Sequence, residues 1–134
     1  MDVNGSCYCG EVQFEAQIDP KRVGICHCTD CQIFASAPFR TSVLVLEEQF
    51  RLVRGEPARY VKTAESGNRR NLAFCKRCGT HLYAAPASGE AGIYSVRVGV
   101  LSQRAELRPA VQLWCQSEIP WLSDLAEIRQ VQMQ

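Results

Sequence analysis

The clustering of the cysteines constrains this chain more than any other feature. Seven of them fall into three short motifs, Cys7-x-Cys9, Cys26-x-Cys28-x-x-Cys31 and Cys75-x-x-Cys78. Such spacing lets sulfurs converge on one point, because residues two apart share a face of an extended segment and residues three apart share a face of a turn. In a chain that shows no export signal, clusters of this kind indicate metal binding rather than disulfides.

Composition and charge narrow the class of protein. Residues 1–5 hold neither a basic nor an apolar run, so we expect no signal peptide, and no apolar run approaches the ~20 residues of a membrane span. The net charge of +1 gives no overall attraction to nucleic acid or to anionic membranes. A length of 134 residues, 46% of them hydrophobic, suits one domain with a modest core. We therefore expect a single cytoplasmic domain over residues 1–134, with no membrane contact and no nucleic-acid partner.

The hydrophobic pattern predicts a mainly β fold. Short strands are expected at residues 11–16, 41–46, 50–53, 59–63, 71–74, 82–84, 94–100 and 110–114. Alternation is clearest at 94–100, where it places Arg97 on the solvent face. Residues 64–70 are polar and contain glycine, which predicts a loop. The short and even spacing of the strands favours antiparallel sheets over βαβ units.

The motif Cys75-x-x-Cys78-Gly79 has the form of a zinc knuckle. In a knuckle, the turn directs backbone N–H groups at the first sulfur, and the glycine tolerates a positive φ. Two further ligands are needed, and Cys7 and Cys9, in an expected extended segment, can supply them. Four thiolates leave no open coordination position, so this zinc would be structural and would close a long loop of a small domain.

Cys26, Cys28 and Cys31 form a second candidate site. Three soft ligands suit Zn²⁺ and leave the fourth tetrahedral position to water or a substrate. Spacing alone leaves two alternatives open: these cysteines can join the knuckle in place of Cys7 and Cys9, or Cys28 and Cys31 can form a redox disulfide. No thioredoxin-like βαβ pattern surrounds them, which favours metal over the disulfide.

Four stretches together resemble the glutathione-dependent formaldehyde-activating enzyme family, which includes centromere protein V-like proteins. The stretches are Gly5-x-Cys7-x-Cys9-Gly10-x-Val12-x-Phe14, Cys26-His27-Cys28-Thr29-Asp30-Cys31, Phe74-Cys75-x-x-Cys78-Gly79-Thr80 and Pro120-Trp121. The resemblance implies an Mss4-like fold of short antiparallel sheets with zinc-binding loops. It implies a structural zinc held by Cys7, Cys9, Cys75 and Cys78. It also implies a second, labile and catalytic zinc held by Cys26, Cys28 and Cys31.

The resemblance further implies a carbon–sulfur lyase that reversibly adds glutathione, or a related small thiol, to formaldehyde. Zinc suits this chemistry because it lowers the pKa of a thiol and can polarise a carbonyl oxygen. The alternative is a non-catalytic zinc module that binds glutathione, a protein or nucleic acid. The enzyme requires a concave pocket at the three cysteines, whereas the module predicts a filled or flat site.

This sequence departs from the family pattern at two positions. Gln112 stands where many relatives carry a histidine, and a glutamine cannot carry a proton. Ser36 stands where a glycine is common. Among the titratable residues nearby, His27 is expected to face away from the metal and make a core hydrogen bond. Asp30 is expected to cap a helix start, with proton transfer as its alternative role.

The remaining candidates are expected to be structural. His81 follows the knuckle and is assigned a packing role. Cys115 has no partner motif and is expected to be a small buried residue. Trp114 and Trp121 are expected in the core. Residues 68–70 and Arg97 could receive the carboxylates of a peptide thiol, but a solvated loop and a strand's wet face are favoured.

Overall fold

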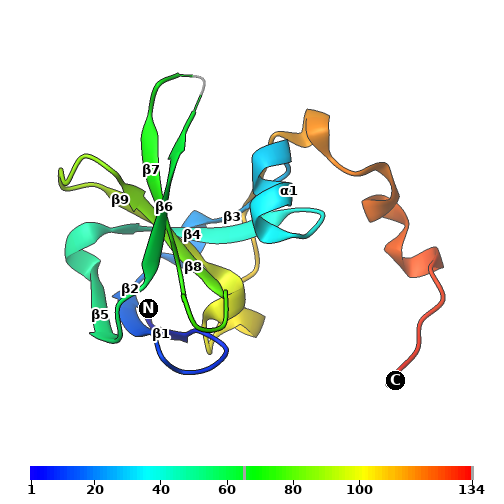
Figure 1. The fold of residues 1–134 in the computed structure, drawn as a ribbon. Helices are drawn as coiled ribbons and strands as arrows, with labels where there is room; N and C mark the ends of the chain where they lie inside the picture. Colours follow the sequence, from blue (N-terminus) through cyan, green and yellow to red (C-terminus); the bar gives the residue numbers. More distant parts are fainter. Residues whose placement is uncertain (65, 134) are drawn as a thin grey trace.

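The computed structural model describes residues 1–64 and 66–133 and shows a mainly β chain with two sheets (Figure 1). The smaller sheet has the order β1–β2–β5, formed by Asp2–Ser6, Gln13–Gln17 and Phe50–Arg54. The larger sheet has the order β10–β3–β4–β9–β8–β7–β6. Its strands, in that order, are Val111–Leu113, Val23–Cys26, Arg40–Leu46, Ile93–Arg97, His81–Pro86, Arg69–Phe74 and Ala58–Thr63.

Helical structure is limited to short pieces. The α-helix α1 spans Thr29–Ala35, directly after β3. Six 3₁₀ segments complete the described chain, η1 to η6, at Pro20–Arg22, Glu47–Gln49, Val98–Val100, Arg104–Glu106, Cys115–Ser117 and Pro120–Glu127. None of the helices in the described ranges is long and apolar enough to cross a membrane.

The mainly β class predicted from the sequence is confirmed, as are most of the strands. The expected strands at 41–46, 50–53, 59–63, 71–74 and 82–84 appear as β4, β5, β6, β7 and β8, with bounds shifted by one or two residues. The expected loop at 64–70 is shorter than predicted, because β7 already begins at Arg69; residue 65 lies outside the described residues. Strands β1 and β3 were not predicted, since each offers too few apolar residues to show a period of two.

One pair of strands departs from the antiparallel rule. β10 runs parallel to β3, with Gln112 opposite Ile25 and Leu113 opposite Cys26. All the other strand pairs of the described residues are antiparallel. Local pattern cannot show this pairing, because it joins segments more than 80 residues apart. The parallel pair brings β10 beside the three-cysteine motif.

The strand expected at 94–100 is shorter than predicted. β9 ends at Arg97, and Val98–Val100 form η3. The end of this strand is buried on both faces, since none of its residues Ser95, Val96, Arg97 and Val98 is exposed to solvent. β9 lies between β4 and β8 in the middle of the sheet, where both faces are covered. The solvent-facing position expected for Arg97 is therefore wrong.

Aromatic rings join the two sheets. Phe14 and Phe50 from the smaller sheet pack at 5.1 Å between ring centroids, and Phe50 contacts Tyr83 and Tyr94 of the larger sheet at 4.7 and 5.0 Å. Burying one such side chain contributes about 1.5–3 kcal/mol. Around these rings lie further buried residues, Val3, Val12, Val23, Val43, Val45, Leu82, Val96 and Leu101.

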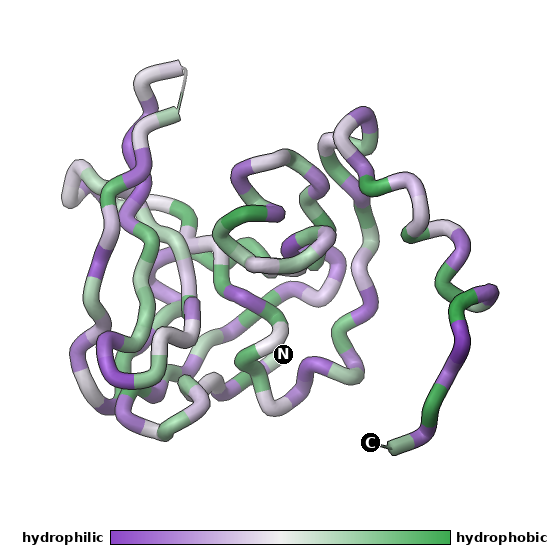
Figure 2. The backbone as a smooth tube through the Cα atoms, turned by 45° about the vertical axis from the view of Figure 1, so that its right-hand side comes forward, coloured by the Kyte–Doolittle hydropathy of each residue, from purple (hydrophilic) through white to green (hydrophobic). Residues whose placement is uncertain are grey.

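The C-terminal segment, residues 114–133, runs away from both sheets (Figure 1), and hydrophobic and hydrophilic residues are interspersed along it (Figure 2). Trp114 and Trp121 are 59% and 48% exposed, so their expected place in the core is wrong. Cys115 is likewise exposed rather than buried. Their apolar character predicted burial, but none of residues 114–133 is buried.

Candidate metal centres and an adjoining hollow

Cys7, Cys9, Cys75 and Cys78 come together from two distant turns. Cys7 and Cys9 follow β1, while Cys75 and Cys78 lie between β7 and β8. Their four sulfurs lie within 4.8 Å of one another, with 3.6 Å between Cys7 and Cys9 and 3.8 Å between Cys9 and Cys75. A tetrahedral zinc with bonds of about 2.3 Å to sulfur needs sulfur separations of about 3.8 Å. The donor set therefore fits zinc in both chemistry and spacing.

Each half of this cluster is a turn closed by a glycine, whose N–H bonds three residues back in the first turn and four residues back in the second. The N–H of Gly10 donates to the carbonyl of Cys7 at 3.1 Å, and the N–H of Gly79 donates to the carbonyl of Cys75 at 2.8 Å. Both glycines have a positive φ, of 79° and 77°. The extended conformation expected at Cys7-x-Cys9 is therefore wrong. The glycine after the second cysteine was the available signal, because only a tight turn needs a residue with positive φ there.

Hydrogen bonds stabilise thiolates at this cluster. The N–H of Val12 donates to Cys7 Sγ at 3.2 Å. Thr80 Oγ1 lies 3.2 Å from Cys78 Sγ, and the hydrogen bonds from the Thr80 hydroxyl and backbone lower the pKa of Cys78 to about 5. The lowered pKa favours the thiolate of Cys78, which is the form that binds a metal ion.

Cys26, Cys28 and Cys31 form the second cluster, and their sulfurs also lie within 4.8 Å of one another. Cys26 ends β3, Cys28 caps the start of α1, and Cys31 lies in the first turn of that helix. The capping bond runs from the N–H of Cys31 to Cys28 Sγ at 3.3 Å. Burial raises the pKa of Cys31. The pKa of Cys28 is lowered despite burial, by hydrogen bonds from Cys31 and by the charge of Arg40.

The structure thus separates the seven motif cysteines into sets of four and three. All eight cysteines are free, so no disulfide joins Cys28 to Cys31. The knuckle lies with Cys7 and Cys9 and not with the other three. None of the histidine or carboxylate atoms in residues 1–64 and 66–133 joins either set within the same 4.8 Å limit.

His27 lies between two of these cysteines in sequence but belongs to neither cluster. Its side chain is buried, and Nε2 donates to Gln112 Oε1 at 2.7 Å. Its backbone N–H donates to the carbonyl of Leu113 at 3.0 Å, within the parallel pair of β3 and β10. A core hydrogen bond is what we expected for this residue, and Gln112 is the partner that sequence reasoning did not find.

Two other titratable residues have structural partners. Asp30 does not cap α1, since the Cys28 sulfur does so; instead Asp30 Oδ2 pairs with Lys62 Nζ of β6 at 2.6 Å. His81 stacks on Phe74, with 5.9 Å between ring centroids, in agreement with a packing role. Burial and the charge of Arg97 lower the pKa of His81.

A hollow of about 500 Å³ adjoins the three-cysteine cluster. One wall begins at Arg40, which pairs with Cys26 across β3 and β4. Another includes Gly79, the glycine of the knuckle, so the hollow extends between the two clusters. Its other lining residues are Phe34, Ala35, Ser36, Phe39, Thr41, His81, Arg97, Gly99 and Val100. The cysteines themselves do not line it.

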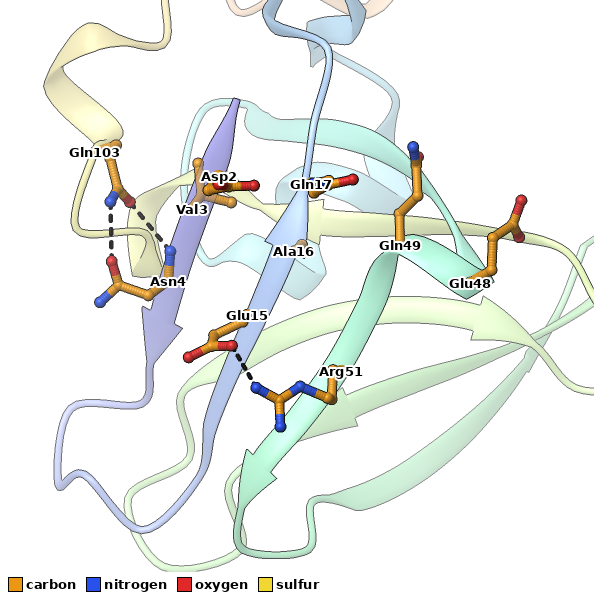
Figure 3. Close-up of a pocket in the computed structure, with 10 residues that line it drawn as sticks. All are labelled: Asp2, Val3, Asn4, Glu15, Ala16, Gln17, Glu48, Gln49, Arg51 and Gln103. Atoms are coloured by element: carbon orange, nitrogen blue, oxygen red, sulfur yellow. Dashed lines mark hydrogen bonds and ion pairs between the residues drawn. The ribbon is translucent and has the colours of Figure 1, made fainter.

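Other hollows lie away from both clusters. One of about 660 Å³ crosses β1, β2 and β5; Figure 3 shows it floored by polar side chains that already bond one another, such as Glu15 with Arg51 at 2.6 Å. Another of about 430 Å³ is lined by residues 67–70 and 86–88. There the half-buried guanidinium of Arg70 donates to the carbonyls of Ala84 and Ile93.

Comparisons with known proteins identify the family and the fold of this chain. Residues 2–117 match the family described as glutathione-dependent formaldehyde-activating enzyme, and the chain belongs to that family. A relative from Schizosaccharomyces pombe, described as an uncharacterized lyase, is 30% identical over 89 residues, which are 66% of this chain and 61% of that protein. The chain thus matches less than two thirds of this relative's length. A solved structure of a Rhodobacter sphaeroides protein shares the fold, with a TM-score of 0.62 and 20% identity over 81% of this chain and 98% of that one.

Proposed function

We propose that this protein is a zinc-dependent carbon–sulfur lyase that adds the thiol of glutathione, or of a related small thiol, to formaldehyde. In that reaction a bond forms between the sulfur and the carbonyl carbon, and the thiol proton ends on the carbonyl oxygen to give S-hydroxymethylglutathione. Family membership and the lyase relative support the class of reaction. The observation that carries the site is the three-sulfur cluster beside a cationic hollow.

We assign different roles to the two clusters. Cys7, Cys9, Cys75 and Cys78 would hold a structural zinc, because four thiolates complete a tetrahedron. Cys26, Cys28 and Cys31 would hold the catalytic zinc, which lowers the pKa of a substrate thiol when it is bound. Zinc together with three thiolates would have a net formal charge of −1. This charge suits an exchangeable, thiol-accepting role better than strong polarisation of a carbonyl.

The surrounding residues position this second cluster. The Cys31 N–H and the charge of Arg40 favour the thiolate of Cys28. His27 and Gln112 are bonded to each other, so we assign the exchange of the thiol proton to solvent. The hollow beside the cluster is concave, but none of the three cysteines lines it, so the choice of an enzyme over a non-catalytic module rests on the family and the lyase relative rather than on a pocket at the sulfurs.

A variant of the second cluster tests the proposal. In Cys28→Ser, turnover of glutathione with formaldehyde should fall by at least about 10²-fold, since the variant lacks one of three metal ligands. Cys115→Ser, which changes an exposed cysteine outside both clusters, is the matched control and should retain full activity. Unchanged turnover in Cys28→Ser would show that this cluster is not catalytic.

Metal content supplies an independent measurement. We expect two zinc ions per chain, falling to one when glutathione or a chelator competes for the three-cysteine site. The same titration on Cys28→Ser should begin at one zinc. A content of one zinc in the wild-type protein at saturating metal would contradict the second site.

A further inference from the structure

The geometry points to a carboxylate-binding subsite in the hollow, formed by Arg40 and Arg97. This inference rests on the proposed function and narrows its substrate to a thiol that carries a carboxylate, such as a peptide thiol. The subsite would hold the acidic end of the substrate while its thiol reaches the three-cysteine cluster.

Arg97 is the first observation. Its residue is only 7% exposed, and it comes from the central strand β9. The guanidinium donates to the carbonyl and to the hydroxyl of Ser95, at 3.2 and 3.3 Å. Among the described residues, the ion pairs are Arg51 with Glu15, Lys62 with Asp30 and Arg77 with Glu11, so no carboxylate neutralises Arg97. Buried charges in proteins are normally paired; this guanidinium is hydrogen-bonded to neutral groups, and the anion that acts on it is the thiolate of Cys31.

Arg40 is the second observation, and it is independent of the first. Its Nε is fully buried and has no hydrogen-bond partner among the described residues. Such an atom costs free energy unless something accepts its proton. Both guanidiniums line the same hollow. Burial, together with the nearby charge of Arg40, lowers the pKa of Arg97 to about 9, although the thiolate of Cys31 acts in the opposite direction.

The metal cluster does not balance this charge. Zinc with three thiolates would carry a single negative charge, whereas Arg40 and Arg97, which both line the hollow, carry two positive charges. Arg70 is partly satisfied by two carbonyl oxygens. An excess of positive charge therefore remains around the hollow, and a carboxylate accepts paired N–H donors from a guanidinium in a favourable geometry.

The shape of the hollow agrees with a peptide-sized ligand. Its volume of about 500 Å³ lies within the usual range for small-molecule sites. Phe34 and Phe39 give it apolar walls for the body of the ligand. Beside Gly79 and Gly99 there is open space where other residues would carry a side chain. Arg40 is close enough to influence the thiols of Cys28 and Cys31, so a ligand held there lies near the cluster.

Binding of S-methylglutathione to the zinc-loaded protein tests the subsite apart from catalysis. This probe keeps both carboxylates but has no free thiol, so isothermal calorimetry reports the hollow and not thiol exchange. We expect measurable binding, weakened at least about ten-fold when both carboxylates of the probe are converted to ethyl esters. If the diester binds as tightly as the parent acid, the inference is wrong, and this comparison needs no variant.

Variants then locate the carboxylate. Arg40→Gln should weaken binding of S-methylglutathione at least about ten-fold, and Arg97→Lys, which keeps the charge but not the planar fork, should weaken it less. Arg54→Gln, on the exposed part of β5, is the matched control and should bind as the wild type does. Melting temperatures of all three confirm that the variants fold. Wild-type affinity in Arg40→Gln would overturn the subsite.

Kinetics separate the subsite from the proposed reaction. With glutathione, Arg97→Lys should raise KM with little change in kcat, while 2-mercaptoethanol, a thiol without a carboxylate, should be used equally well by this variant and the wild type. If the wild type binds S-methylglutathione through Arg40 but turns over no thiol, the subsite stands and the proposed reaction fails. An equal loss with both thiols would show that Arg97 acts on the metal cluster and not on a carboxylate.

Discussion

Nε2 of His27 and Oε1 of Gln112 lie 2.7 Å apart, and this hydrogen bond joins the end of β3 to β10 beside the three-cysteine cluster. The carbonyl oxygen can only accept, so the proton is on Nε2. Nδ1 is buried and has no partner among the described residues. Gln112 therefore supplies the only side-chain hydrogen bond that the buried ring of His27 makes among the described residues.

Replacing Gln112 should show how much this hydrogen bond contributes to the free energy of unfolding. In Gln112→Leu both ring nitrogens of His27 would lack partners, and we expect a loss of about 1–2 kcal/mol in the free energy of unfolding. Urea denaturation of the zinc-loaded protein measures it. Gln17→Leu, an exposed position on β2, is the control for added hydrophobic surface. Equal stability of Gln112→Leu and the wild type would mean that the bond contributes nothing.

Loss of Cys75 should abolish cooperative folding. Cys75 is fully buried, and its cluster fastens the turn after β1 to the turn between β7 and β8. A structural zinc contributes on the order of 10 kcal/mol, comparable to the whole stability of a small domain. We expect Cys75→Ser to show no thermal transition by circular dichroism and to lose one zinc.

The control for this experiment is Cys115→Ser, which should keep both its zinc content and its melting temperature, because Cys115 is exposed and lies outside both clusters. A sharp transition in Cys75→Ser at the wild-type temperature would contradict a structural role for the four-cysteine zinc.

The sequence predicted those features that depend on short spacing. The motif around Cys75 predicted a turn, and β4 was visible as an apolar run. The sequence did not predict the features that depend on pairing between segments far apart in the chain. The alternation at residues 94–100 predicted that Arg97 faces solvent. In the structure, residues of α1 and of the knuckle lie over that face of the strand and Arg97 is buried. Gln112 looked like the absence of a proton carrier, and only the parallel pairing of β10 with β3 shows that it bonds His27.

Ser36 marks a position where the backbone is strained. It ends α1 in the left-handed conformation, with φ of 48° and ψ of 42°. A side chain in that conformation costs on the order of 1 kcal/mol, which glycine avoids. We expect Ser36→Gly to raise the free energy of unfolding by about 0.5–1 kcal/mol, measured by urea denaturation. Ser36→Ala keeps the Cβ and should give no such gain; a gain of equal size would show that the backbone is not the cause.

Asp30 offers a choice between a structural and a catalytic role. It pairs with Lys62 at 2.6 Å, which links α1 to the edge strand β6, and its side chain is 55% exposed. An exposed ion pair contributes about 0.2–1 kcal/mol, and an acidic residue in the first turn of a helix adds a few tenths more. We therefore expect Asp30→Asn to lose less than about 1.5 kcal/mol of stability and to keep kcat within about two-fold.

Lys62→Gln is the matched variant, because it breaks the same pair from the other side. If the role of Asp30 is structural, the two substitutions cost similar stability, the double variant costs little more than either, and all three retain turnover. A proton carrier would behave differently: its loss lowers kcat by about 10²- to 10⁴-fold, while loss of the lysine does not. Such a fall in Asp30→Asn alone would show that this carboxylate, and not solvent, exchanges the thiol proton.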